Sequence, residues 1–151
     1  MTMNYTIVHY PNQILLTPCN YVPVVNETIR SIFTLMERAM KDNNGIGLAA
    51  NQLGIPLNMI IVKYGNNIYK VVNPELSVWD LSITKQTEGC LSFPDKEVTT
   101  YRYKEVQVKG LNEFGNPFDI TVKGELSVIF QHEWDHIKGR TMLDRKYDKN
   151  I

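Results

Sequence analysis

The sequence contains very few cysteines and histidines. Among its 151 residues there are two cysteines, Cys19 and Cys90, and three histidines. Two cysteines that lie far apart in the sequence cannot form a framework of disulfides, so we expect a reducing, cytoplasmic setting in which both thiols are free. A thiolate in such a setting is able to bind a metal ion.

The sequence also lacks an excess of charge, a long apolar run and a recognisable leader. Its sixteen basic and sixteen acidic residues cancel, which gives no electrostatic reason to expect nucleic acid or an anionic membrane as a partner. No apolar run approaches the roughly 18–20 residues of a transmembrane helix. Residues 1–5 have no basic region followed by an apolar stretch, so we expect no signal peptide. The length and the 43% of hydrophobic residues suit a single globular domain, residues 1–151.

Apolar residues at spacings of three and four predict two helices. Three prolines make residues 5–25 an extended arm or loop. Asn26 can cap a helix of about four turns that ends at Asn43-Asn44-Gly45. A second helix begins at Gly124 and ends at Gly139. On it, one side is apolar, and the opposite side carries Ser127, Gln131 and Lys138.

Alternating apolar and polar residues predict strands between the two helices. We expect a hairpin from residues 57–62 and 68–73, ended by Asn73-Pro74, and a further strand over residues 75–87, bent near Trp79-Asp80. Residues 97–111 and 118–122 are expected to pair across the turn at 112–116. The predicted class is α+β: mixed or antiparallel strands pack around a central second helix, with one further helix near the N-terminus.

The second helix carries Gln131-His132-Glu133-Trp134-Asp135-His136. Positions i and i+4 lie on the same face of a helix, so His132 and His136 can bind one metal ion. Glu133 follows His132 by about 100° around the axis, where a general base could take a proton from metal-bound water. Two surface histidines in ion pairs are the alternative, but two of only three histidines fall at the chelating spacing.

A catalytic metal usually has three protein ligands and an open position, so two histidines are not enough. Downstream of His136 there is no histidine and no glutamate, only Asp144 and Asp148. The strongest upstream candidate is Cys90, because a thiolate is a good ligand for a borderline metal. A lone cysteine is more often a small buried hydrophobe. The sequence nevertheless favours a Cys-His-His site over the usual protease arrangement.

A strip of small residues, Gly45–Gln52, follows the first helix. Its two glycines and two alanines allow the backbone to come close to a ligand or another strand, and a tight helix-to-strand turn would explain them equally well. The pattern matches no phosphate-binding loop. Gln52 ends the strip with a neutral amide that can donate to an oxyanion.

Three stretches of the sequence resemble the signature motifs of the peptide deformylases, in the family's order and at similar separations. They are Gly45–Gln52 (GIGLAANQ), Glu88–Ser92 (EGCLS) and Gln131–His136 (QHEWDH). The resemblance covers nearly the whole chain and implies hydrolytic removal of the formyl group from N-formylmethionine of new polypeptides. Asn51 and Glu125 depart from the residues common in the family. The tail after Arg145 is short and resembles reduced forms such as those carried by phages.

The resemblance implies a role for each site residue. Cys90, His132 and His136 would bind the metal. Glu133 would move the proton, while Gln52 and the backbone N–H of Leu91 would stabilise the oxyanion. The implied substrate-binding residues, of which Ile46, Val128 and Ile129 would wall the methionine pocket, are Gly45, Ile46, Gly47, Glu88, Gly89, Val128 and Ile129. Glu88 and Asp135 would also orient ligands and nearby basic groups.

The resemblance further implies ferrous iron as the cofactor, with Zn²⁺, Ni²⁺ or Co²⁺ as substitutes. The implied partners are N-formylmethionyl polypeptides, with the ribosome exit region as a second candidate, and no nucleic acid or membrane. We expect a monomer in the cytoplasm, which would be the host cytoplasm for a phage-borne form. Two alternatives stay open: a zincin-like peptidase with a carboxylate as third ligand, and a non-catalytic binding module stabilised by a metal.

Overall fold

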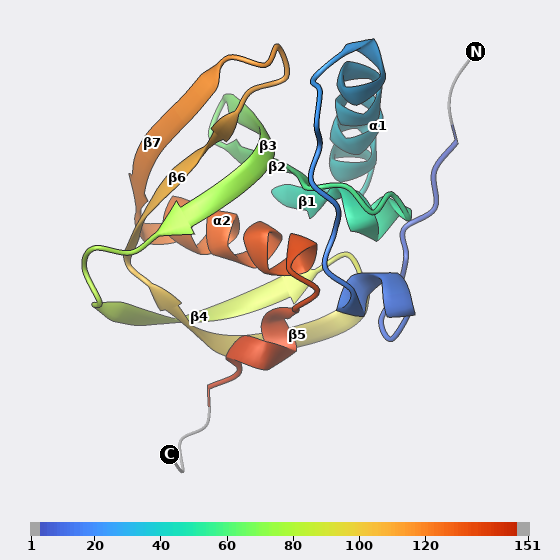
Figure 1. The fold of residues 1–151 in the computed structure, drawn as a ribbon. Helices are drawn as coiled ribbons and strands as arrows, with labels where there is room; N and C mark the ends of the chain where they lie inside the picture. The colour runs from blue at the N-terminus through green and yellow to red at the C-terminus, as the bar shows by residue number, and fades with distance from the viewer. Residues whose placement is uncertain (1–3, 148–151) are drawn as a thin grey trace.

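The computed structural model describes residues 4–147, so both ends of the expected domain 1–151, including Met1–Met3 and Asp148, lie outside the described residues. Figure 1 shows a central helix held between a large sheet and a two-stranded hairpin, with a second helix to one side. The elements in chain order are η1 Gln13–Leu16, α1 Glu27–Asp42, β1 Gly47–Ala49, η2 Ala50–Leu53, β2 Met59–Tyr64, β3 Asn67–Ser77, β4 Ile83–Cys90, β5 Phe93–Tyr103, β6 Glu105–Leu111, β7 Pro117–Lys123, α2 Gly124–Ile137 and η3 Met142–Arg145.

The strands form two antiparallel sheets. The larger has the order β1-β2-β3-β6-β7, and the smaller is the β4–β5 hairpin. Helix α2 lies between them, as the prediction of strands around a central helix requires, and the α+β class is confirmed (Figure 1). Neither described helix has the length and apolar character that a membrane crossing requires.

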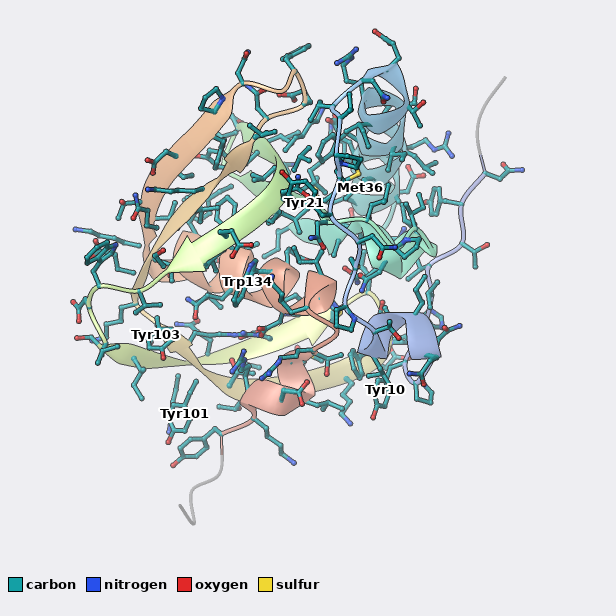
Figure 2. All side chains as sticks on the ribbon, viewed as in Figure 1. Tyr10, Tyr21, Met36, Tyr101, Tyr103 and Trp134 are labelled. Atoms are coloured by element: carbon teal, nitrogen blue, oxygen red, sulfur yellow. The ribbon has the colours of Figure 1, made fainter. Side chains whose placement is uncertain are left out.

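Helix α1 forms where the spacing of apolar residues predicted it. The Asn26 side chain accepts a hydrogen bond from the N–H of Ile29 at 3.2 Å, which caps the first turn. The apolar side of the helix packs on the large sheet. Met36, labelled in Figure 2, belongs to that side and is fully buried. This apolar stripe is therefore core.

Helix α2 is buried on both sides, which corrects the expectation of a helix with one polar, solvent-facing side. Ser127 and Gln131 are buried. The Ser127 hydroxyl donates to the carbonyl of Tyr103 at 3.0 Å, and the Gln131 side chain bonds both the N–H and the carbonyl of Tyr103. The β4–β5 hairpin covers this side of the helix, so its polar residues serve the neighbouring strand instead of water. Gly139, at φ +76°, ends the helix as predicted.

Three of the predicted strands are extended or divided in the structure. β3 continues through Asn73-Pro74 to Ser77, because a shift in register between Val72 and Glu75 lets the strand pass the proline. The strand predicted over 75–87 is therefore two segments, the end of β3 and β4. The strand predicted over 97–111 is also divided, since β5 pairs with β4 while β6 belongs to the large sheet. Alternation marks strands well, but it does not say which sheet a strand joins.

Candidate active site

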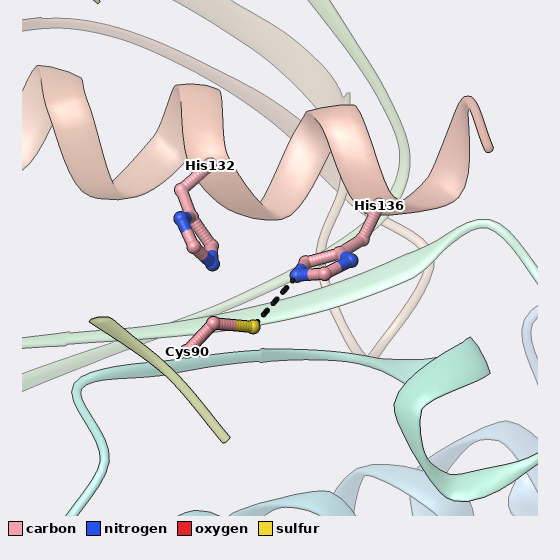
Figure 3. Close-up of side chains that lie close together, drawn as sticks. All are labelled: Cys90, His132 and His136. Carbon is pink, nitrogen blue, oxygen red and sulfur yellow. Dashed lines mark hydrogen bonds between the residues drawn. The ribbon is translucent and has the colours of Figure 1, made fainter. Parts of the chain in front are cut away.

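The three predicted metal ligands meet between β4 and α2. His132 and His136 lie on successive turns of α2, and Cys90 ends β4 (Figure 3). The Cys90 Sγ is 3.3 Å from His136 Nε2, and the three ligand atoms all lie within 4.8 Å of one another. The register of the hairpin shifts between Gly89 and Cys90, and such a shift can re-aim a side chain at a strand end.

His132 is held by a carboxylate behind it. Its Nδ1 lies 2.7 Å from Glu88 Oε1 and donates to it, which leaves Nε2 free to face Cys90 (Figure 3). Burial by itself would raise the pKa of Glu88, but hydrogen bonds from Arg102 and His132 outweigh it and lower this pKa to about 2. Glu88 is therefore ionised and accepts strongly from the ring.

His136 is fully buried, and burial lowers its pKa well below the ordinary value, so the ring is neutral. The Asn51 side chain donates to the backbone carbonyl of His136 at 2.7 Å. A neutral imidazole and a thiol sulfur at this separation suit a divalent metal with nitrogen and sulfur ligands. Burial would lower the pKa of His132, yet the negative groups around it, Glu133 first among them, raise it well above the ordinary value. The same negative groups favour a cation.

Glu133 stands beside this cluster with one oxygen unpaired. Its Oε1 is buried and has no hydrogen-bond partner within residues 4–147. Burial raises the pKa of Glu133 to about 7, despite the opposing influence of His132. A Cβ atom added at Gly47 would collide with this carboxylate. Gly47 thus leaves room for Glu133. The sequence suggested a close ligand or strand, or a tight turn, as the reason for the glycines, and this third reason was missed.

A cleft of about 1050 Å³ opens onto the site. It is lined by every predicted site residue except Asp135 and His136, both of which are buried. β1 forms one wall and is one of the two edge strands of the large sheet. Three charged residues that line the cleft were assigned no role in it from the sequence: Asp95, Lys96 and Glu97.

Comparison with known proteins decides the family. A family model described as polypeptide deformylase matches residues 4–150. The chain belongs to the peptide deformylase family. The peptide deformylase of Aquifex aeolicus is 41% identical over 145 residues, which covers 92% of this chain and 85% of that relative.

Solved peptide deformylases have the same fold. The Thermotoga maritima enzyme superposes with a TM-score of 0.94 at 31% identity and covers 97% of this chain and 100% of its own. The Synechococcus elongatus enzyme, solved in complex with actinonin, superposes with a TM-score of 0.92 at 27% identity. The match covers 97% of this chain and 80% of that chain. The resemblance drawn from the three motifs is confirmed. The chain is a metal-dependent hydrolase that removes N-formyl groups from nascent polypeptides.

Gln52 joins the first two of the peptide deformylase motifs. Its Oε1 accepts from the N–H of Ala49 at 2.9 Å, and its Nε2 donates to Ser92 Oγ at 3.1 Å and faces Cys90 Sγ at 3.6 Å. Ser92 is buried and fixes this amide, a role that the sequence did not suggest although Ser92 ends the second motif.

Two arginines near the site were also missed. Arg102 donates to Glu88, and Arg145 donates to Asp135. No local sequence pattern distinguishes these arginines from surface ones, because their partners lie in other elements.

Proposed function

We propose that residues 1–151 form a single deformylase domain whose catalytic metal is bound by Cys90, His132 and His136, with Glu133 as general base. The observation that carries this assignment is the meeting of three ligand atoms within 4.8 Å beside a buried carboxylate whose pKa is about 7. When bound, the metal would lower the pKa of a water molecule and polarise the formyl carbonyl.

Ferrous iron is the proposed metal, and zinc, nickel or cobalt would replace it. This choice follows the family resemblance, because a ligand set of one cysteine and two histidines suits several divalent metals. A site with a thiolate ligand is sensitive to oxidation at the sulfur as well as at iron. Activity should therefore be measured without oxygen.

Glu133 would accept the proton of the attacking water and return it to the leaving amine. A carboxyl group with a pKa of about 7 can take up and release a proton near neutral pH. Its Oε1, to which none of residues 4–147 donates a hydrogen bond, could accept one from the water. Gly47 keeps the carboxylate close to the ligands, since a larger residue there would push it away.

Gln52 and the Leu91 N–H would stabilise the oxyanion of the tetrahedral intermediate. The Gln52 amide is held from both ends by Ala49 and Ser92, so it needs little reorganisation during the reaction. Loss of one such donor typically lowers kcat on the order of 10²- to 10³-fold.

The substrate would lie along the outer edge of β1. An extended peptide can add to an edge strand through backbone hydrogen bonds, and Gly45–Gly47 together with Gly89 border the cleft there. The methionine side chain would enter between Ile46, which is 52% exposed, and the buried Val128 and Ile129 of α2. Glu88 serves this pocket by holding His132.

The proposed setting is the cytoplasm, with the protein acting as a monomer on N-formylmethionyl polypeptides near the ribosome exit region. The family's action on nascent polypeptides supports this setting. Sedimentation of the purified protein would test the monomer, and co-sedimentation with ribosomes would test the contact.

The deciding experiment is an anaerobic assay of formate release from formyl-Met peptides, with the metal content of the same sample measured. We expect formate release in proportion to bound iron, and loss of both in Cys90→Ala. Actinonin, which the Synechococcus relative binds, should inhibit the reaction. A folded, iron-loaded protein that releases no formate would overturn the proposal.

A further inference from the structure

A chain of ion pairs, buried except for the arginine at its far end, runs from the proposed metal ligand His132 to the last turn of the described structure. Its four members are Glu88, Arg102, Asp135 and Arg145, here called the ion-pair chain. Glu88 accepts from His132 Nδ1 at 2.7 Å, and from Nε and Nη2 of Arg102 at 2.7 and 2.8 Å. The Thr100 hydroxyl also donates to Glu88.

Asp135 is the link between the two arginines. Arg102 Nη1 donates to Asp135 Oδ2 at 2.6 Å. From the other side, Arg145 holds both carboxylate oxygens, with Nε 3.1 Å from Oδ2 and Nη2 2.9 Å from Oδ1. Asp135 lies on α2 between the two metal-ligating histidines, so a shift of this residue moves the helix that carries them.

The burial of the ion-pair chain makes each member depend on the others. Glu88, Arg102 and Asp135 are 7%, 3% and 2% exposed, whereas the Arg145 side chain is 35% exposed. The ion-pair chain contains two positively charged and two negatively charged side chains. Removal of one partner from a buried ion pair leaves an uncompensated charge, which the remaining groups must rearrange to satisfy.

We propose that Arg145 is a positioning residue for the metal centre, acting on His132 through Asp135, Arg102 and Glu88. With Arg145 present, Asp135 is satisfied and Arg102 keeps two bonds to Glu88, which then holds the His132 ring. Without it, Asp135 draws Arg102 away from Glu88, and the ring loses its fixed orientation. The proposal rests on Cys90, His132 and His136 being the metal ligands.

The turn that carries Arg145 has anchors of its own. In η3, Asp144 accepts from the N–H of Thr141 at 2.9 Å, and Thr141 accepts from the N–H of Leu143 at 3.2 Å. Met142 is buried and packs in the cluster that contains Phe93. η3 therefore stays in place without Arg145, which separates its effect on the metal from simple loss of the turn.

The test uses cobalt as the probe, in the full chain. Cobalt-loaded Arg145→Met is mixed with an excess of chelator, and the release rate is followed through its visible spectrum. Loss of a direct partner of a metal ligand typically lowers metal affinity about 10- to 100-fold, so for this more distant residue we expect release about 3- to 10-fold faster. Arg145→Lys keeps the positive charge but loses the paired hydrogen bonds of a guanidinium group. Its cobalt release rate should therefore lie between those of Arg145→Met and the unchanged protein.

Arg140→Met is the matched control, because Arg140 is an exposed arginine of the same segment and is not a member of the ion-pair chain. It should release cobalt at the rate of the unchanged protein. In a Glu88→Gln background the link is already broken, so Arg145→Met should add little to the release rate there. A changed cobalt spectrum in Arg145→Met, with an unchanged one in Arg140→Met, would support the inference further.

The outcomes separate this inference from the proposed function. Equal release rates and spectra for Arg145→Met, Arg145→Lys and the unchanged protein would overturn the inference and leave the metal centre intact. If the double variant changed the cobalt release rate by the product of the two separate effects, the inference would also be overturned. An unchanged protein that takes up no cobalt would overturn the metal centre itself, and the inference with it.

Discussion

Glu133 is buried, and its Oε1 has no hydrogen-bond partner among the described residues. Replacement by glutamine keeps the size of the side chain and removes its ability to accept a proton. We expect Glu133→Gln to bind metal as before and to lose about 10²- to 10⁴-fold in kcat. Formate release and metal content measured on one sample will check this. Deformylation at the original rate would contradict the role of general base.

Gly47 is needed because of the side chain opposite it. A Cβ at this position would collide with the carboxylate of Glu133, so Gly47→Ala should destabilise the protein by about 1–3 kcal/mol in urea unfolding. The control is the same change in a Glu133→Ala background, where the carboxylate is gone and the cost should largely disappear. An equal cost in both backgrounds would show that Gly47 serves the backbone rather than Glu133.

The two cysteines should react differently with alkylating reagents. Burial raises the pKa of the Cys19 thiol to about 11, so at pH 8 only about one molecule in a thousand carries its thiolate. We expect iodoacetamide to label Cys90 in metal-free protein, and Cys19 only as the pH rises toward 11. Bound metal should protect Cys90. Mass spectrometry of the labelled peptides measures both, and rapid labelling of Cys19 at pH 8 would contradict its raised pKa.

At the scale of elements, α2 depends on polar contacts as much as on apolar packing. Gln131 joins the helix to β5 through the N–H and carbonyl of Tyr103. Gln131→Ala leaves these groups without their partner and should lower the free energy of unfolding by about 1–3 kcal/mol. Gln13→Ala, at an exposed position, should stay within about 0.5 kcal/mol of the unchanged protein. Equal changes in the free energy of unfolding for both variants would mean that the hydrogen bonds between Gln131 and Tyr103 contribute nothing to stability.

At the scale of the whole molecule, the metal would join the two layers that enclose it. Cys90 comes from the β4–β5 hairpin and both histidines from α2, so metal binding favours the folded arrangement of hairpin and helix. At a free metal concentration of 100 Kd the expected gain is about 2.7 kcal/mol, which raises Tm by several degrees. Scanning calorimetry with and without metal measures it.

Two cysteine variants provide the comparison for this measurement. Cys90→Ala should lose most of the metal-dependent rise in Tm, because a ligand is missing. Cys19→Ala should keep the full rise, since Cys19 packs against a core cluster and is not one of the proposed ligands. A similar rise in both variants would contradict Cys90 as a ligand.

Prediction from the sequence succeeded where the determining interactions are local. Helix α1 was predicted with its cap because Asn26 and Ile29 are one turn apart. The chelating pair His132 and His136 follows from helical geometry in the same way. Cys90 could be proposed because the downstream sequence offers no histidine or glutamate as third ligand. β3 was predicted too short, since its passage through Asn73-Pro74 depends on the register with β6.

The sequence by itself therefore determined the two helices, the alternation of the strands and the motifs that place the chain in its family. Only the tertiary structure decided that the hairpin brings Cys90 to within 3.3 Å of His136, that Gly47 makes room for Glu133, and that the ion-pair chain ends at Arg145. The physical reason is distance along the chain. Helical spacing and capping act over a few residues, whereas buried charges find partners dozens of residues away, once packing has excluded water.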